Sequence, residues 1–214
     1  MINTDGAPRP QNTVLPENDA LKAKLYIGLV HYPIKSKDGG IVQTSMTNLD
    51  IHDIARTART YNLSGYYLIA PPVCQLEVVN KIIGHWSNGF GFEYNSDRSD
   101  ALALVKKAGS IEEVCDLITG ETGRKTSVIV TDAKIHQDLR NITCISMQNM
   151  LKLHDFNFLL LFGTGWGLAD AVIAKADYIL EPVRPLTVHN YNHLSVRAAA
   201  AIIIDRVVGE NVFI

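Results

Sequence analysis

The chain has 214 residues, of which 47% are hydrophobic and 20% are charged, as is usual for a globular protein with one medium-sized domain. No stretch has the apolar length of a membrane span. The formal net charge of −2 gives no overall electrostatic case for a nucleic-acid partner, because proteins that bind phosphates usually carry a basic excess. Any contact with a nucleic acid must therefore be local.

The first 24 residues are polar and contain prolines, without the apolar core of a secretory signal. We expect them to form a flexible tail, followed by a single domain over residues 25–214. Cys74, Cys115 and Cys144 are odd in number and lack metal-ligand spacing, so we expect reduced thiols in a cytoplasmic protein without a bound metal. Each thiol is expected to fill the core rather than to act as a nucleophile.

The first half of the chain alternates short β-rich runs with segments of helical spacing. The predicted elements are strands at 24–32, 65–71 and 88–94 and helices at 48–62, 75–86, 99–107 and 110–118. Asn48 or Asp50 is the expected cap of the first helix. On that helix, His52, Arg56 and Arg59 form a stripe that we expect to face away from the core.

The second half continues this alternation. The predicted elements are strands at 126–131, 157–163 and 177–182 and helices at 145–154, 166–176 and 194–208. The run NFLLLFG at 157–163 is apolar without alternation, which is typical of a central parallel strand buried on both faces. The last helix is apolar around nearly its whole circumference, so we expect a second subunit to cover it in a homodimer. The sequence predicts an α/β fold with a mostly parallel sheet and helices on both faces.

Ligands of such sheets bind at the carboxyl ends of strands, here the segments after residues 131, 163 and 182. The middle segment, FGTGWGLAD, places Gly163, Gly165 and Gly167 between a strand and a helix, where the backbone can approach a ligand. It has no lysine and does not match the GxGxxG spacing, so a nucleotide phosphate is not required. The alternative is that these glycines only allow a tight turn. Trp166 has little local apolar surface to bury, which favours contact with a ligand or a partner subunit.

Three segments of the chain resemble the cofactor-binding motifs of the trefoil-knotted RNA methyltransferases of the SPOUT superfamily; in order, they are FGTGWGLAD, ILEPV and YNHLSVRAA. The segment TNLDIHDIARTART extends the similarity to nearly everything after the tail. The chain looks similar to a bacterial branch related to the tRNA guanine-N1 methyltransferase. The resemblance implies a C-terminal trefoil knot, S-adenosylmethionine as cofactor, and tRNA or rRNA as substrate.

By motif position, the resemblance implies that three loops hold the cofactor, mostly through the main chain. The residues concerned are Thr131, Gly163, Thr164, Gly165, Trp166, Ile179, Leu180, Glu181, Val183, His193, Leu194 and Ser195. Backbone groups suit this task because they offer fixed donors and acceptors without side-chain entropy. We expect the Glu181 carboxylate to face the sulfonium or a ribose, with a solvated rim residue as the alternative. His193 either orders the pocket or makes only local hydrogen bonds.

Relatives that methylate ribose carry an N-x-x-x-x-x-R pattern on the first helix; Arg56 matches its arginine and Asp50 stands at the asparagine position. We expect Arg56 to position a phosphate or stabilise a deprotonated nucleophile, Arg59 to contact RNA phosphate, and Asp50 or Asp53 to accept a proton. Solvated surface charges are the alternative, chiefly for Arg59 and Asp53. The glycine loop lacks the glutamate of those relatives, and His193 replaces their asparagine. The methylated atom, a base nitrogen or a ribose 2′-oxygen, therefore stays open.

Two other functions are alternatives to an RNA methyltransferase. The missing loop glutamate favours a non-catalytic RNA-binding or assembly factor that keeps the methyltransferase fold. A dinucleotide-dependent oxidoreductase ranks last, because neither the glycine spacing nor the acidic residue expected after the next strand matches its fingerprint.

Overall fold

The computed structural model describes residues 21–71, 76–87, 95–138, 140–187 and 191–210. Most of the predicted tail, Cys74 and the predicted strand at 88–94 lie outside these ranges. None of the described helices is long and apolar enough to cross a membrane.

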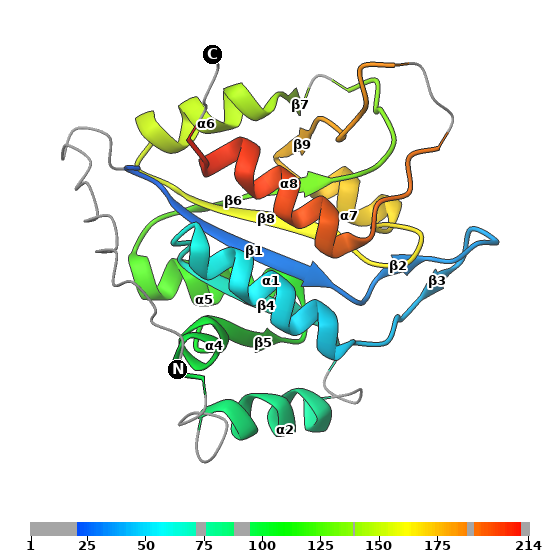
Figure 1. Ribbon diagram of the computed structural model, residues 1–214. Coiled ribbons are helices and arrows are strands. Elements are labelled where there is room, and N and C mark those ends of the chain that lie inside the picture. Colours follow the sequence, from blue (N-terminus) through cyan, green and yellow to red (C-terminus); the bar gives the residue numbers. More distant parts are fainter. Residues whose placement is uncertain (1–20, 72–75, 88–94, 139, 188–190, 211–214) are drawn as a thin grey trace, which may run out of the picture.

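A seven-stranded sheet forms the centre of the fold, and all its strand pairs are parallel (Figure 1). Across the sheet the strands are β5 (Val105–Ala108), β4 (Gly65–Ile69), β1 (Lys24–Val30), β8 (Asn157–Gly163), β6 (Thr126–Thr131), β9 (Tyr178–Leu180) and β7 (Asn141–Ile142). β8 is the middle strand and is buried from its first residue to its sixth, as its unbroken apolar run predicts.

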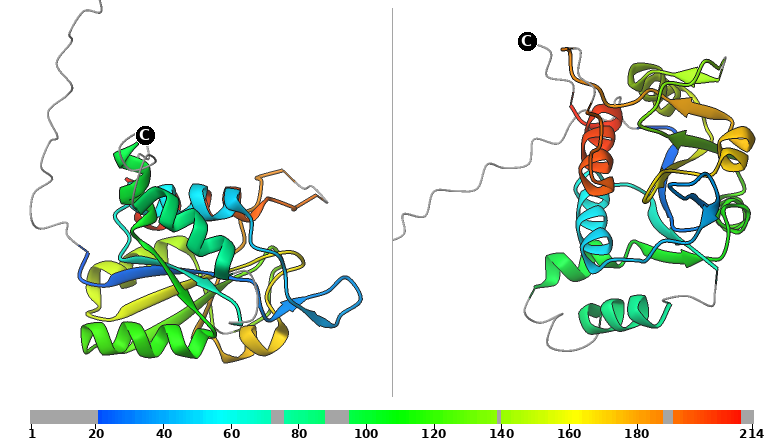
Figure 2. Two further views of the ribbon diagram at one scale, coloured as in Figure 1. Left: turned by 90° about the horizontal axis from the view of Figure 1, so that it is seen from below. Right: turned by 90° about the vertical axis from the view of Figure 1, so that its right-hand side faces the viewer.

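Helices cover both faces of the sheet (Figure 2). One face carries α1 (Asn48–Thr60), α6 (Cys144–Leu153) and α8 (Val196–Val208), and the other carries α5 (Ile111–Thr122) and α7 (Asp170–Lys175). Successive strand side chains point to opposite faces, so Leu29 of β1 packs in the first core and Val30 in the second. The predicted α/β class, with a parallel sheet between two helical layers, is confirmed; the knot stays a prediction.

Two smaller units extend this framework. α2 (Leu76–Ser87) and α4 (Ser96–Leu102) lie on the side of α1 nearest the β5 edge, and α4 packs against both α1 and α2. β2 (Ile34–Lys35) and β3 (Ile41–Val42) form a short antiparallel hairpin after β1.

The helix predicted at 99–107 is wrong in its second half. α4 begins earlier, at Ser96, and ends at Leu102, after which the chain forms β5. Val105 and Ala108 of β5 are buried, while Lys106 and Lys107 reach polar partners at the surface. The segment is too short for its hydrophobic periodicity to distinguish a helix from a strand. Pairing with β4 decides the conformation, because it supplies hydrogen bonds to the backbone of this segment.

Two helix starts also differ from the predictions. The cap of α1 is Thr47 rather than Asn48 or Asp50; its hydroxyl accepts a hydrogen bond from the Asp50 N–H. α7 begins only at Asp170, not at Trp166, because Gly165 and Gly167 have positive φ angles that keep the preceding residues in a loop.

α8 packs between α1 and α6, which cover much of the apolar surface expected to need a second subunit. Its fully buried residues are Ala200, Ile203, Ile204 and Val207. The side chains of Ala201 and Ile202 are half-buried, so part of the helix remains accessible within a single chain.

Candidate functional site

Three of the predicted cofactor loops leave the sheet side by side. β8, β6 and β9 are neighbours, and the register pairs Thr131 with Leu180, while Thr131 Oγ1 donates a hydrogen bond to the Leu161 carbonyl (2.9 Å). Further along, Asn192 Nδ2 donates to the Ala133 carbonyl (3.0 Å), which ties the third loop to the first. The parallel sheet therefore brings together segments that are far apart in the sequence.

The loop after β8 requires glycine at one position because of a close backbone contact and at two others because of a positive φ angle. A Cβ at Gly163 would lie 2.6 Å from the Leu168 nitrogen, so this loop folds back too tightly for a side chain. Gly165 has φ +54, and a Cβ there would lie 3.2 Å from the Thr44 side chain. Gly167 has φ +94, with no atom within 4 Å of its added Cβ. The backbone at Gly167 thus borders open space.

The hairpin after β1 holds this glycine loop in place. Lys35 N–H donates to the Gly167 carbonyl (2.9 Å), and Ala169 N–H donates to the Pro33 carbonyl (3.2 Å). Lys35 Nζ also forms an ion pair with the carboxylate of Asp170, the first residue of α7. The loop is thereby fixed at both its apex and its exit.

A partly buried chain of hydrogen-bonded side chains supports the loop. Thr164 Oγ1 donates to the Val30 carbonyl (3.0 Å) and lies 2.5 Å from Thr44 Oγ1, which is 3.0 Å from His31 Nδ1. His31 is only 1% exposed, and burial lowers its pKa to about 4 against the opposing effects of Asp50 and Thr44. The imidazole is therefore neutral at neutral pH. The sequence analysis did not identify His31 as part of the site. The feature that could have done so is a histidine directly after the apolar strand β1.

The glycine loop also offers free donors. The backbone N–H groups of Gly165 and Trp166 have no hydrogen-bond partner within the described part of the chain, and both residues are exposed. The Trp166 side chain is 62% exposed. Two adjacent donors beside open backbone and an accessible indole fit the hydroxyl, carboxylate and ring groups of S-adenosylmethionine.

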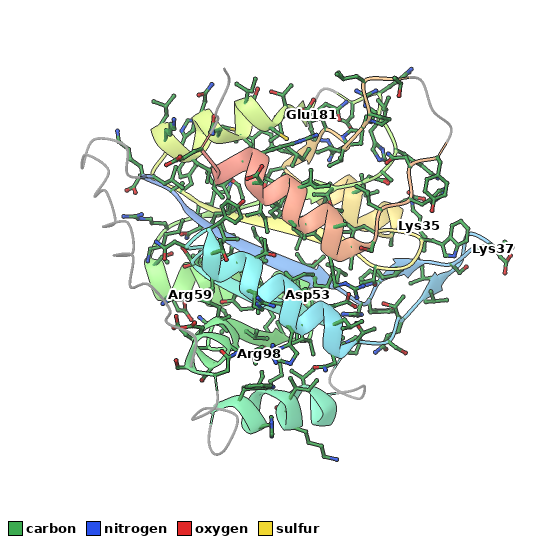
Figure 3. All side chains as sticks on the ribbon, viewed as in Figure 1. Lys35, Lys37, Asp53, Arg59, Arg98 and Glu181 are labelled. Carbon is green, nitrogen blue, oxygen red and sulfur yellow. The ribbon has the colours of Figure 1, made fainter. Side chains whose placement is uncertain are left out.

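In the third loop, part of the main chain makes hydrogen bonds within the fold. The N–H groups of Ile179 and Glu181 donate to the carbonyls of Arg140 and Ile142, both 2.9 Å away, so the β7 segment already uses them. Glu181 Oε1 accepts a hydrogen bond from Cys144 N–H (2.8 Å) at the start of α6, beside which it lies in Figure 3. This carboxylate therefore stabilises a helix N-terminus, a role that its place at the end of a strand did not suggest.

The remaining predicted cofactor residues surround the start of α8. His193, Leu194 and Ser195 are exposed, and Ser195 is the N-cap of the helix, its hydroxyl accepting from Ala198 N–H (3.2 Å). Val183 is half-buried against the core.

The two predicted proton acceptors on α1 both contact Arg197 of α8. Asp50 is 8% exposed and accepts hydrogen bonds from Thr47 Oγ1 (2.6 Å) and Arg197 Nη1 (3.2 Å). Asp53 is exposed, with Oδ2 3.5 Å from Arg197 Nε. Arg197 was not singled out from the sequence, although it lies within the YNHLSVRAA motif.

The two predicted RNA-binding arginines have different surroundings. Arg59 lies near the end of α1, and its Nε is 2.6 Å from Asp100 Oδ2 of α4 (Figure 3). Arg56 is exposed and lines a cleft between α1 and α2. The pairing of Arg59 supports the alternative that it is a surface charge. Within the described ranges, no cluster of three or more histidine, cysteine or acidic side chains is arranged to hold a metal ion.

A family model described as SAM-dependent RNA methyltransferase matches residues 24–209. The chain belongs to this family. The expected family resemblance and the expected cofactor, S-adenosylmethionine, are thereby confirmed. Membership in this methyltransferase family leaves the oxidoreductase alternative without support.

Two relatives extend the comparison. The chain is 44% identical over 186 residues to a tRNA (guanine-N(1)-)-methyltransferase of Oleidesulfovibrio alaskensis, a match that covers 87% of this chain and 42% of that protein. The chain thus spans less than half the length of this relative. An uncharacterized protein of Aquifex aeolicus is 37% identical over 191 residues, with 89% of this chain and 91% of that protein covered.

The fold of this methyltransferase family is also found among solved structures. A probable methylase family protein from Haemophilus influenzae Rd KW20 superposes with a TM-score of 0.59 at 15% identity, covering 87% of this chain and 66% of that chain. At this identity the likeness concerns the fold alone.

Proposed function

We propose that this chain transfers a methyl group from S-adenosylmethionine to a nucleotide of tRNA. The observation that carries the proposal is the glycine loop at the carboxyl edge of β8, where Gly165 and Trp166 present two N–H groups without a partner among the described residues, beside open backbone. Family membership supplies the cofactor class. The name of the Oleidesulfovibrio relative supports tRNA, although that protein is more than twice as long as the matched region.

The bound cofactor would supply a methyl group on a positively charged sulfur. The chain must then align the accepting nucleotide and remove its proton. Asp53 suits proton removal better than Asp50, because Asp50 is buried and engaged by both Thr47 and Arg197. Arg56 has no carboxylate partner among the described residues and can bind a phosphate or a deprotonated base.

Incubation with cofactor labelled in its methyl group and a tRNA pool, followed by nucleoside analysis, tests the proposal. We expect one labelled nucleoside, whose identity also names the methylated atom. Gly165→Val is the matched negative control, because it changes the cofactor loop and leaves α1 intact. Cofactor binding and RNA binding without label in any nucleoside would contradict the proposed transfer.

A non-catalytic RNA-binding factor is the second candidate. The observation that favours it is that both candidate bases already have a cationic partner, because Arg197 Nη1 lies 3.2 Å from Asp50 Oδ1 and Arg197 Nε lies 3.5 Å from Asp53 Oδ2. Asp53→Asn separates the two candidates: a methyltransferase that uses this base loses turnover and keeps RNA affinity, whereas a binding factor shows no turnover in either form.

We also propose that the protein acts as a cytoplasmic homodimer. Exposed apolar side chains occur on two segments near the proposed cofactor edge: Trp166 is 62% exposed and Leu194 is 46% exposed. Such surface favours burial against a second copy. Sedimentation equilibrium tests this: a monomer at micromolar concentration would contradict it.

A further inference from the structure

The cleft between α1 and α2 lies away from the glycine loop, on the side of α1 opposite α8. Its volume is about 540 Å³. The lining residues come from α1, the second half of α2 and α4, and include Asp53 and Arg56 of α1, Lys81 and Trp86 of α2, and Arg98 of α4. Figure 3 shows Arg98 in the space between α1 and α2.

The cleft has an excess of positive charge. Arg56, Lys81 and Arg98 line it, and none of them lies within ion-pair distance of a carboxylate in the part of the chain that the structure describes. Its one acidic lining residue, Asp53, contacts Arg197 outside the cleft lining. By contrast, Arg59 on the same helix pairs with Asp100. Unpaired cations gathered in a concave surface favour an anionic ligand, even in a chain with a net charge of −2.

Trp86 holds one of these cations in position. The guanidinium carbon of Arg98 lies 4.7 Å from the centroid of the Trp86 ring, a cation–π contact. His52 and His85 meet the same indole edge-on, with ring centroids 5.7 and 5.2 Å away. An arginine fixed by an aromatic ring keeps its donors available and loses less side-chain entropy when it binds phosphate.

His52 reports the same positive environment. Burial lowers its pKa, the nearby Arg98 lowers it further, Asp53 opposes this, and Arg56 adds a smaller lowering effect. The His52 ring is thus kept neutral beside two guanidinium groups. The positive charge of the cleft therefore comes from Arg56, Lys81 and Arg98.

We propose that this cleft binds the phosphodiester backbone of the RNA substrate directly beside the nucleotide that is methylated, with Lys81 and Arg98 contacting the flanking phosphates. The inference rests on the proposed function for its substrate class. Phosphate oxygens match the guanidinium donors of Arg56 and Arg98 and the ammonium of Lys81. The cleft supplies affinity independently of the cofactor loops.

Arg98→Gln and Lys81→Gln test this in the full chain. The matched controls are Arg206→Gln in the last turn of α8 and Lys152→Gln in the last turn of α6, two exposed cations outside the cleft. The affinity for a fluorescein-labelled tRNA is measured by anisotropy over a range of salt concentrations without cofactor. Calorimetry with S-adenosylmethionine follows on the same proteins.

Each cleft variant is expected to bind tRNA about five- to tenfold more weakly at 0.1 M salt, with the slope of log affinity against log salt reduced by about one unit. The controls and the affinity for S-adenosylmethionine should not change. Wild-type affinity and slope in both cleft variants would overturn the inference. So would a change from dimer to monomer in sedimentation, because the cleft would then be an interface between copies.

The two proposals fail in different ways. Cleft-dependent tRNA binding without methyl transfer would contradict the proposed function and leave the cleft assignment intact. Methyl transfer with a tRNA affinity that does not change in the Arg98 and Lys81 variants would support the proposed function and contradict the cleft assignment. A wild-type protein that binds no RNA would overturn both.

Discussion

Arg197 Nη1 lies 3.2 Å from Asp50 Oδ1, and this contact joins the first turn of α8 to the first turn of α1. The two residues are 147 positions apart in the sequence. Because α8 follows directly on the third cofactor loop, the contact ties the position of that loop to the helix that carries Arg56 and Asp53. It couples the proposed cofactor edge to the helix on which RNA binding is proposed.

Replacing Arg197 with glutamine should destabilise the fold by about 1–3 kcal/mol, because Asp50 would keep a buried carboxylate with Thr47 as its remaining side-chain partner. Urea unfolding measures the effect. Arg206→Gln, on the exposed end of the same helix, should change the free energy of unfolding by less than about 0.5 kcal/mol. Equal free energies of unfolding for the two variants would show that the Arg197–Asp50 contact does not stabilise the fold.

Gly165→Val should abolish binding of S-adenosylmethionine, whereas Arg56→Ala should retain it and lose transfer. Valine at φ +54 is strained, and its side chain would also press on Thr44, so the loop must change shape. Isothermal calorimetry gives both affinities. Gly120→Val is the control, since Gly120 lies in α5 with open space around it and no positive φ. Loss of cofactor binding in Arg56→Ala would contradict the separate roles of loop and helix.

The buried His31 should make stability fall as the pH is lowered from about 6.5 towards 4. Its pKa in the folded protein is about 4, below the ordinary 6.5, so in this range the unfolded chain takes up a proton that the folded chain does not. The loss attributable to His31 should reach roughly 2–3 kcal/mol at the acidic end.

Urea unfolding at pH 7, 6, 5 and 4 measures this dependence. His31→Gln should flatten it, while His154→Gln, an exposed histidine after α6, should leave it as in the wild type. A His31→Gln protein with the wild-type pH profile would show that another group is responsible.

The Cys144 thiol should resist alkylation in the folded protein. It is 8% exposed, and burial followed by the nearby Glu181 carboxylate raises its pKa to about 11, so little thiolate exists at pH 8. In a Cys74→Ser background, mass spectrometry after iodoacetamide treatment should find Cys144 unmodified until urea unfolds the chain. Rapid labelling of Cys144 without denaturant would contradict its burial at the start of α6.

Local sequence features predicted most of the framework. The unbroken apolar run of β8 indicated a central strand, and alternating strands and helices indicated a parallel α/β sheet, because burial on both faces selects such runs. The glycines of FGTGWGLAD marked the loop whose backbone approaches open space. These features depend on residues close together in the chain, so they can be recognised from the sequence alone.

Side-chain partnerships across the fold were decided only by the tertiary structure. Thr44 and Thr164 are 120 positions apart, and Glu181 reaches Cys144 across 37 positions, so neither contact has a local periodic signal. The strand β5 likewise formed where helical spacing suggested a helix, because pairing with β4 outweighed local preference. Sequence pattern specifies which surfaces are buried, whereas the polar partners of His31, Asp50 and Glu181 depend on how those surfaces pack in three dimensions.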